Sequence, residues 1–173
     1  MTRNGTGRKG VATALAVTLV TLLLSSCATV VADYAREQRW ADEVVPGLVV
    51  GDAVRIETAG GRSFLGIHAA ASRPRGAIIL VHGSGVHPDF ATVGQLRTLL
   101  NDAGFTTLSI QMPVLAADAP GENYRALFAE AGERIAAAIG WLRAKQPTRV
   151  ALVSHSMGAR MALDYVKRHP DAP

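Results

Sequence analysis

One continuous apolar run at residues 77–81, with the sequence Ala-Ile-Ile-Leu-Val, constrains the fold of this chain more than any other feature. The run is short and leads directly into the turn residues His82, Gly83, Ser84 and Gly85. Apolar runs of this length are typical of strands that are buried on both faces, and such strands belong mainly to parallel sheets. The sequence therefore predicts a sheet that is covered by helices on both sides.

The rest of the body alternates between strand patterns and helix patterns. In the helical segments, apolar residues recur three or four positions apart. We predict strands at residues 77–81, 105–110 and 149–154, and helices at residues 93–103, 124–146 and 157–168. This alternation is typical of an α/β fold in which right-handed crossovers connect parallel strands. In the first of these helices, the apolar face is predicted to consist of Val93, Leu96, Leu99, Leu100 and Ala103.

The segment before the first parallel strand has a different pattern. Residues 49–58 and 63–70 flank the turn Gly60-Gly61, and partial alternation of apolar residues predicts that they form an antiparallel pair. Residues 27–47 are polar and mixed, so we expect a short helix or a tether there.

Composition limits the number of domains and the kinds of partner. The chain has 173 residues, of which 49% are hydrophobic and 18% are charged, and these values are typical of one globular domain. The formal net charge is +4, but from Cys27 onward there are fifteen Lys and Arg against fourteen Asp and Glu. A body so close to neutral is not expected to bind nucleic acid. The single cysteine excludes a disulfide framework, and no metal or cofactor motif is found.

Residues 1–26 have the pattern of a secretory signal peptide. Basic residues precede an apolar stretch at residues 11–24, which is shorter than the roughly 20 residues of a membrane-spanning helix. The stretch ends in Leu24-Ser25-Ser26-Cys27, which resembles the bacterial lipobox. The resemblance implies cleavage before Cys27, lipid attachment to that residue, and anchoring to a membrane of the bacterial cell envelope. An ordinary cleaved signal and an uncleaved anchor are the alternatives.

The motif Ser154-His155-Ser156-Met157-Gly158 joins the last predicted strand to the last predicted helix. In so tight a turn, the residues two before and two after the central serine approach each other, so they must be small. Ser154 and Gly158 meet this requirement. We predict that the turn strains Ser156 and presents its hydroxyl above the sheet as a catalytic nucleophile.

The turn after the strand at residues 77–81 is the second candidate site. Gly83 and Gly85 allow the backbone to turn and to approach a ligand closely. We predict that the amides of Ser84 and Met157 form an oxyanion hole, which would stabilise the negative charge that develops on a carbonyl oxygen during acyl transfer. His82, Gly83 and Gly85 are expected to support this loop.

Together these motifs resemble those of the α/β-hydrolase superfamily, whose elbow has the pattern G-x-S-x-G. In this chain Ser154 replaces the first glycine. The segments around Trp40, at residues 82–89 and at residues 108–113 resemble bacterial proteins of the DUF3530 type. This resemblance extends over residues 35–173 and implies that residues 48–173 are the N-terminal part of a hydrolase domain, with no known substrate.

No residue after Ser156 is expected to complete a catalytic triad. The superfamily places first an acid and then a histidine after the nucleophile, and the chain offers only Asp164, His169 and Asp171 there. Asp164 lies within the predicted helix, and a helix rise of 1.5 Å per residue would put His169 about 20 Å from Ser156. We therefore expect that the chain is truncated and that the acid and the histidine lie beyond it.

Three earlier histidines, His82, His87 and His155, are expected to be structural or solvated, because Asp89 alone is near enough in sequence to orient one. Two functions follow. The chain belongs to a serine hydrolase of the esterase or acyl-hydrolase type, acting on a small-molecule ester or acyl substrate, or it is a catalytically inactive, lipid-anchored binding protein on a hydrolase scaffold.

Overall fold

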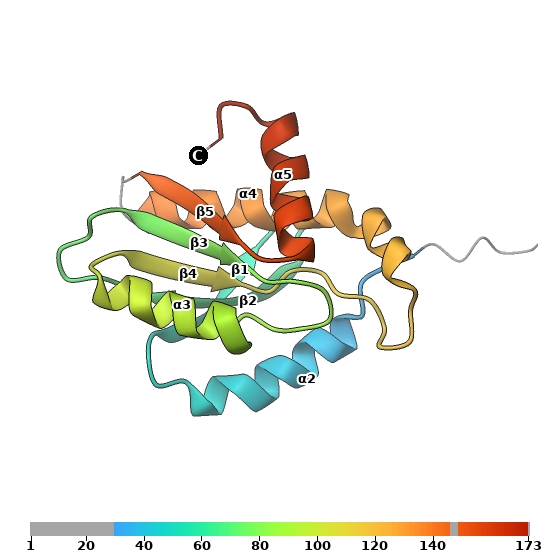
Figure 1. The fold of residues 1–173 in the computed structure, drawn as a ribbon, viewed down its shortest axis with the longest axis horizontal. Helices are drawn as coiled ribbons and strands as arrows, with labels where there is room; N and C mark the ends of the chain where they lie inside the picture. The colour runs from blue at the N-terminus through green and yellow to red at the C-terminus, as the bar shows by residue number, and fades with distance from the viewer. Residues whose placement is uncertain (1–29, 146–148, 173) are drawn as a thin grey trace, which may run out of the picture.

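The computed structural model describes residues 30–145 and 149–172 (Figure 1). The predicted signal peptide, the predicted lipidation site Cys27 and the predicted helix end at Gln146 and Pro147 lie outside the described residues.

A five-stranded sheet with the strand order β1-β2-β4-β3-β5 forms the centre of the molecule. β2 is antiparallel to both β1 and β4, whereas β3 is parallel to both β4 and β5. The predicted α/β class is therefore confirmed, with a mostly parallel sheet and an N-terminal antiparallel pair. The strands are β1 (Asp52–Glu57), β2 (Ser63–Ala69), β3 (Ala77–Val81), β4 (Thr106–Ile110) and β5 (Val150–Ser154).

Helices cover both faces of the sheet (Figure 1). α4 and α5 share the larger hydrophobic core with one face, while α2 and α3 pack on the other. The helices are α2 (Tyr34–Val44), α3 (Ala91–Asp102), α4 (Phe128–Lys145) and α5 (Met157–Arg168), and the short 3₁₀ helices are η1 (Val45–Gly47) and η2 (Gly121–Leu127).

β3 is buried on both faces, as its apolar sequence predicts. Ile79 and Val81 face the core beneath α4, whereas Ile78 and Leu80 pack with Val93 of α3. All four side chains are at most 7% exposed. Successive residues of a strand point to opposite faces, so a strand enclosed from both sides requires apolar residues at every position.

The apolar face predicted for α3 is partly wrong. Leu99 is 64% exposed, whereas Arg97 is only 3% exposed. The inner position is taken by Arg97 because its guanidinium donates hydrogen bonds to Asp89 and to the carbonyl oxygen of Val50. Helical periodicity alone assigns a charged residue to the solvent, so it placed the wrong residue inside.

Two element boundaries also differ from the predictions. The first strand begins at Asp52 rather than at residue 49, because Gly51 has φ +80° and a Cβ atom there would lie 2.6 Å from the carbonyl oxygen of His68. Val49 is consequently 94% exposed. Residues 124–127, predicted as the start of a long helix, belong to the 3₁₀ helix η2.

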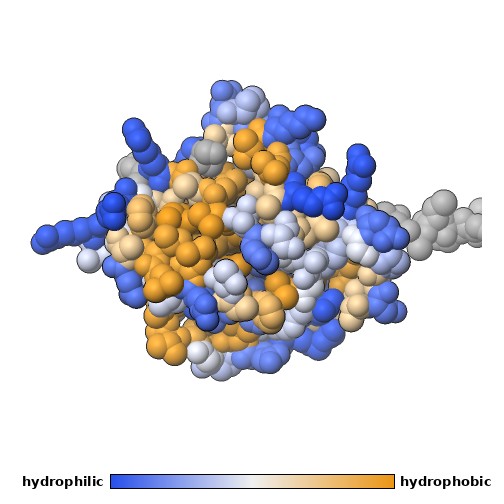
Figure 2. All heavy atoms as spheres, viewed as in Figure 1, coloured by the Kyte–Doolittle hydropathy of each residue, from blue (hydrophilic) through white to orange (hydrophobic). Residues whose placement is uncertain are grey.

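β5 forms one edge of the sheet. Among the residues that the structure describes, it pairs with β3 and with no other strand. Hydrophobic atoms gather at the surface between α3 and α5 (Figure 2). The apolar residues on that side of the sheet include Ile78, Phe105 and Val153. No helix within the described ranges is long and apolar enough to span a membrane.

Candidate active site

The turn between β5 and α5 holds Ser156 in a strained conformation. Its backbone has φ 54° and ψ −124°, and it is one of two non-glycine residues with positive φ in the part of the chain described. Ser156 occupies the N-cap position of α5, but its side chain makes no capping hydrogen bond. Ser156 is an exposed residue, and its hydroxyl is not used to cap this helix end.

Gly158 allows this turn to pack against the end of β3. A Cβ atom on Gly158 would lie 2.2 Å from the carbonyl oxygen of His82 and 2.7 Å from that of Val81. The amide of His155 also donates a hydrogen bond to the carbonyl oxygen of Val81, at 3.1 Å. Ser154, the last residue of β5, is exposed and lies opposite Val81. The small residues of the motif thus let the elbow approach the loop that follows β3.

The predicted oxyanion loop lies directly beside Ser156. A Cβ atom on Gly83 would be 3.1 Å from the Cβ atom of Ser156 and 3.5 Å from its Oγ atom. Gly83, Ser84 and Ser156 line one small cavity together. The structure therefore brings together the predicted nucleophile and the predicted oxyanion loop, from segments more than 70 residues apart.

Both backbone polar groups of Gly85 are held in place. Its amide donates to the hydroxyl of Tyr124 at 2.8 Å, and its carbonyl oxygen accepts from Arg36 at 3.3 Å. Gly85 has φ +68°, which is a conformation that favours glycine. Within the described residues, no hydrogen bond uses the amide of Ser84 or that of Met157. These two amides remain available as donors to a ligand.

His82 is buried and fully used by its surroundings. Its Nδ1 atom is 2.8 Å from the carbonyl oxygen of Gly83, and its Nε2 atom accepts from the amide of Met112 at 2.9 Å. Gln111 lies 3.1 Å from the same Nε2 atom. Burial lowers the pKa of His82 to about 4. The neutral imidazole therefore links the ends of β3 and β4 and is not placed to take a proton from Ser156.

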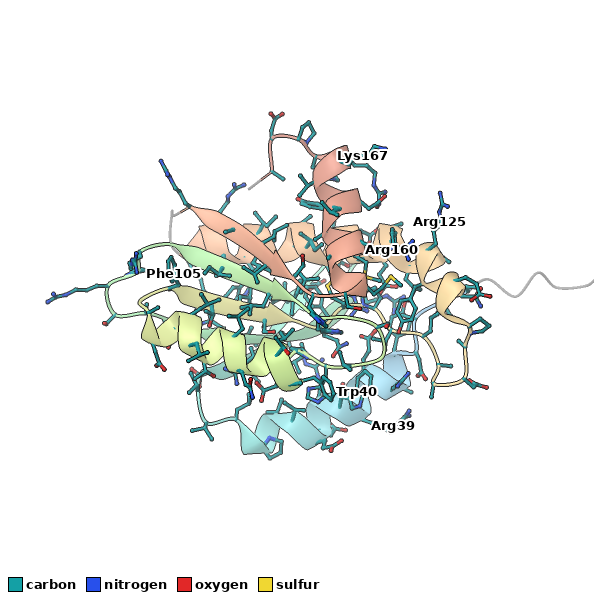
Figure 3. The ribbon with its side chains drawn as sticks, in the orientation of Figure 1. Arg39, Trp40, Phe105, Arg125, Arg160 and Lys167 are labelled. Carbon is teal, nitrogen blue, oxygen red and sulfur yellow. The ribbon has the colours of Figure 1, made fainter. Side chains whose placement is uncertain are left out.

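His87, Asp89, Asp164 and His169 are also engaged away from Ser156, whereas the exposed His155 lies next to it. His87 contacts Trp40 of α2, which lies beneath the loop after β3 (Figure 3), and burial lowers the pKa of His87. Asp89 forms an ion pair with Arg97. At the far end of α5, His169 stacks on Tyr165, and Asp164 pairs with Arg168. Among residues 30–145 and 149–172, no histidine forms a hydrogen bond with Ser156.

A buried ion-pair network surrounds Arg134, and the helical pattern of the sequence did not predict it. Arg134 of α4 is completely buried, although its position reads as polar surface in the helical pattern. Its guanidinium donates to Glu37 at 2.8 Å, to Glu130 at 2.5 Å and to the carbonyl oxygen of Gln111 at 3.0 Å. Burial raises the pKa of Glu37, and the charge of Arg134 opposes this shift. The partners are up to 97 residues apart, so local periodicity carries no sign of the network.

No group of three or more His, Cys, Asp and Glu side chains in the described portion of the chain is arranged to hold a metal ion.

Solved structures with a similar arrangement are α/β hydrolases. A cold-adapted esterase from an Arctic intertidal metagenomic library matches with a TM-score of 0.58 and 20% identity, over 69% of this chain and 56% of the esterase. A dienelactone hydrolase from Anabaena variabilis matches with a TM-score of 0.56 and 21% identity, over 69% of this chain and 58% of that protein. A dienelactone hydrolase-like promiscuous phosphotriesterase from metagenomic libraries matches with a TM-score of 0.52 and 21% identity, over 67% of this chain and 54% of that protein.

The fold is thus that of an α/β hydrolase, and the chain spans a little over half the length of these two structures. The sequence profile of one family, "Protein of unknown function (DUF3530)", matches residues 13–131. The chain belongs to this family. The matched region includes the loop at residues 82–85 but ends before the elbow at Ser156. No curated protein matches the sequence.

Proposed function

We propose that the chain is the N-terminal part of a serine hydrolase that cleaves small-molecule esters or related acyl compounds. The observation that carries the proposal is the strained backbone of Ser156 beside the loop of Gly83 and Ser84, with a hydroxyl that has no hydrogen-bond partner among the described residues. A serine at a sharp strand-to-helix turn, facing free backbone amides, is the arrangement that acyl transfer by a serine nucleophile requires.

In the proposed reaction, Oγ of Ser156 attacks the carbonyl carbon of the ester and gives its proton to a histidine. The amides of Ser84 and Met157 hold the oxygen that becomes negative in the tetrahedral intermediate, and each donor of this kind is worth about 3–4 kcal/mol in the barrier. The intermediate collapses to an acyl-serine as the alcohol leaves with the proton. Water then attacks the acyl-serine and releases the acid.

The proposal places the triad acid and the histidine outside the printed sequence. Three observations support this. No described histidine forms a hydrogen bond with Ser156, β5 has an unpaired edge among the described residues, and the apolar side chain of Val153 on β5 is only partly buried. Additional strands and helices would cover these surfaces and would bring two further catalytic side chains to the same end of the sheet.

We also propose that the protein is lipid-anchored through Cys27 in the bacterial cell envelope. The pattern of residues 1–27 supports this location. Mass spectrometry of the mature N-terminus tests it: a peptide beginning at Cys27 with added acyl chains is expected, and an unmodified Cys27 would contradict the anchor.

A lipid-anchored protein that binds a ligand without turning it over is the second candidate. The engagement of His82 by Gly83 and Met112 favours it, because this buried histidine cannot serve Ser156. One experiment distinguishes the two functions. The protein expressed from its complete gene is assayed with 4-nitrophenyl acetate, with Ser156→Ala as the control. Hydrolysis that is lost in the variant supports the hydrolase, whereas no hydrolysis above the variant's level favours the binding protein.

A further inference from the structure

The cavity beside Ser156 is small and mostly apolar on its outer side. Its volume is about 190 Å³. The side of the cavity where the proposed reaction takes place is formed by Gly83, Ser84 and Ser156, and His155 lies next to them. The opposite wall consists of Val86, Phe90, Ala91, Thr92 and Val93, from the loop after β3 and the first turn of α3.

The volume of the cavity limits what it can accept. An apolar cavity of about 150 Å³ is enough to bind benzene, whereas sites for drug-sized ligands are roughly 300–1,000 Å³. A cavity of about 190 Å³ therefore accommodates a group about the size of a phenyl ring or a short branched alkyl chain. The long acyl chain of a membrane lipid exceeds it.

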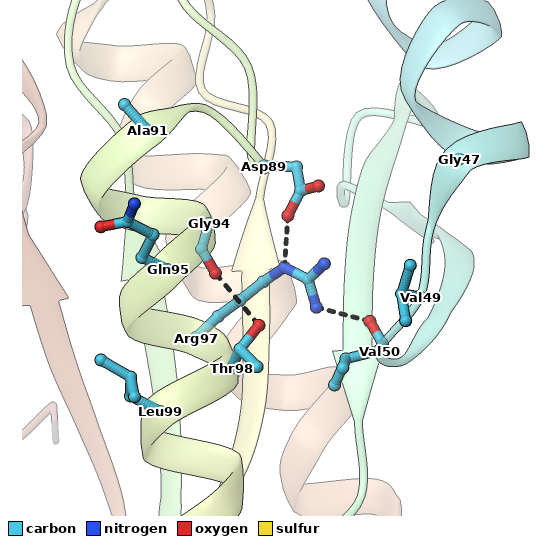
Figure 4. Close-up of a pocket in the computed structure, with 10 residues that line it drawn as sticks. All are labelled: Gly47, Val49, Val50, Asp89, Ala91, Gly94, Gln95, Arg97, Thr98 and Leu99. Carbon is cyan, nitrogen blue, oxygen red and sulfur yellow. Dashed lines mark hydrogen bonds and ion pairs between the residues drawn. The ribbon is translucent and has the colours of Figure 1, made fainter.

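The outer wall is held firmly, so it cannot easily yield to a larger group. Asp89, just before this wall, accepts a hydrogen bond from Arg97 at 2.6 Å, and Arg97 also donates to the carbonyl oxygen of Val50 (Figure 4). The carbonyl oxygen of Pro88 accepts from Ser109 at 2.6 Å. A Cβ atom on Gly94 would lie 2.4 Å from the carbonyl oxygen of Asp89, so the first turn of α3 is pressed against this segment.

Two residues of the wall, Ala91 and Phe90, are also constrained by their surroundings. Ala91 has φ 41°, a backbone conformation that an alanine adopts only when its surroundings enforce it. Phe90 is 48% exposed and is contacted edge-on by His87, with ring centroids 5.6 Å apart. His87 in turn contacts Trp40 of α2. The ring of Phe90 at the outer side of the cavity is therefore in contact with one neighbouring ring, that of His87.

We infer that this cavity is the acyl pocket of the enzyme and that it selects small acyl groups, such as short, branched or phenylacetyl groups, against long lipid chains. The inference rests on the proposed function, since it assigns the cavity to the substrate of Ser156. Val86 and Phe90 are the specificity-determining residues. A pocket with rigid walls discriminates by size, because a group that is too large must displace packed side chains.

The experiment has a binding arm that needs no catalysis. The protein expressed from its complete gene is labelled at its valine methyl groups and titrated with 4-fluorotoluene. We expect saturable shifts of the Val86 and Val93 methyl resonances, and a loss of affinity of about tenfold or more in Val86→Phe, which fills the cavity. Val31→Ala is the matched control, because Val31 is an exposed valine that does not line this cavity. Unshifted Val86 and Val93 resonances would overturn the inference.

The second arm measures kcat/KM for 4-nitrophenyl phenylacetate and 4-nitrophenyl octanoate. We expect the first to exceed the second by about tenfold or more, and Phe90→Ala to reduce this ratio while Val31→Ala leaves it unchanged. Equal values for the two esters would overturn the inference even though Ser156 is active. Binding of 4-fluorotoluene without hydrolysis of either ester would contradict the hydrolase and leave the small apolar pocket standing.

Discussion

Gly158 packs so closely on His82 that a Cβ atom at position 158 would lie 2.2 Å from the carbonyl oxygen of His82. This contact joins the elbow after β5 to the loop after β3, which are the two segments that form the candidate site. The contact involves backbone atoms, so a side chain at this position cannot be accommodated by rotating a neighbour.

Gly158→Ala is therefore expected to lower the free energy of unfolding by about 3 kcal/mol, at the upper end of the cost of overpacking. Gly140 provides a matched control within α4, because nothing lies within 4 Å of the Cβ position there. Gly140→Ala should raise stability by about 0.4–1 kcal/mol. Urea unfolding of both variants checks the pair, and equal effects would show that residue 158 is not in tight contact.

The sheet could be predicted from the sequence because its central strands are enclosed on both faces. Residues 77–81 are apolar at every position, and a strand with that pattern has few alternatives to the middle of an α/β sheet. The turn at Ser156 could be predicted as well, since a small residue two positions on either side is a steric requirement. Both features depend on neighbouring residues in the chain.

Features that depend on distant partners could not be predicted. Arg134 is buried because Glu37, 97 residues away, meets it in the folded structure, and Arg97 because it reaches the carbonyl oxygen of Val50, 47 residues away, while the helical pattern reads both arginines as surface residues. The same limit explains the error at Leu99, which is exposed because Arg97 occupies the inner face of α3. Tertiary ion pairs override local periodicity at these positions.

The buried network gives a second prediction. Arg134→Met should lower the free energy of unfolding by about 3–5 kcal/mol, because Glu37 and Glu130 would be left without their shared cation. Arg143→Met, at an exposed position of the same helix, should change stability by no more than about 0.5 kcal/mol. Thermal or urea unfolding measures both. If Glu37→Gln in the Arg134→Met background restores no stability, the uncompensated charge of Glu37 is not the cause of the stability loss in Arg134→Met.

The burial of His82 makes stability depend on pH. Its pKa is lowered from 6.5 to about 4 in the folded state. The unfolded chain therefore takes up a proton first as pH falls, and the contribution of neutral His82 to stability, complete above pH 6.5, is lost as pH approaches 4. This loss amounts to about 3 kcal/mol. The difference between the wild type and His82→Gln, measured by urea unfolding from pH 7 to pH 4, should show it.

Imidazole resonances provide the direct check on the same residue. The His82 ring should stay neutral in NMR spectra until the pH reaches about 4. Titration near its ordinary value would mean that the ring is solvated and does not link Gly83 to Met112.

Tyr124 is expected to position the oxyanion loop. Its hydroxyl accepts hydrogen bonds from the amides of Gly85 at 2.8 Å and Leu115 at 3.3 Å. Tyr124→Phe leaves both amides without this acceptor, so we expect a stability loss of about 1–3 kcal/mol and faster hydrogen exchange at Gly85. Tyr165→Phe is the control, since Tyr165 is also a buried tyrosine and its hydroxyl makes no hydrogen bond within the described residues. Unchanged exchange at Gly85 would show that the loop is held in another way.

Reaction of the protein from its complete gene with a fluorophosphonate, followed by peptide mapping, tests the nucleophile most directly. A serine with an activated hydroxyl should form a covalent adduct at Ser156, and the adduct should be absent in Ser156→Ala. An unmodified Ser156 under conditions that label a known serine hydrolase, or equal labelling of the variant at another residue, would contradict the account.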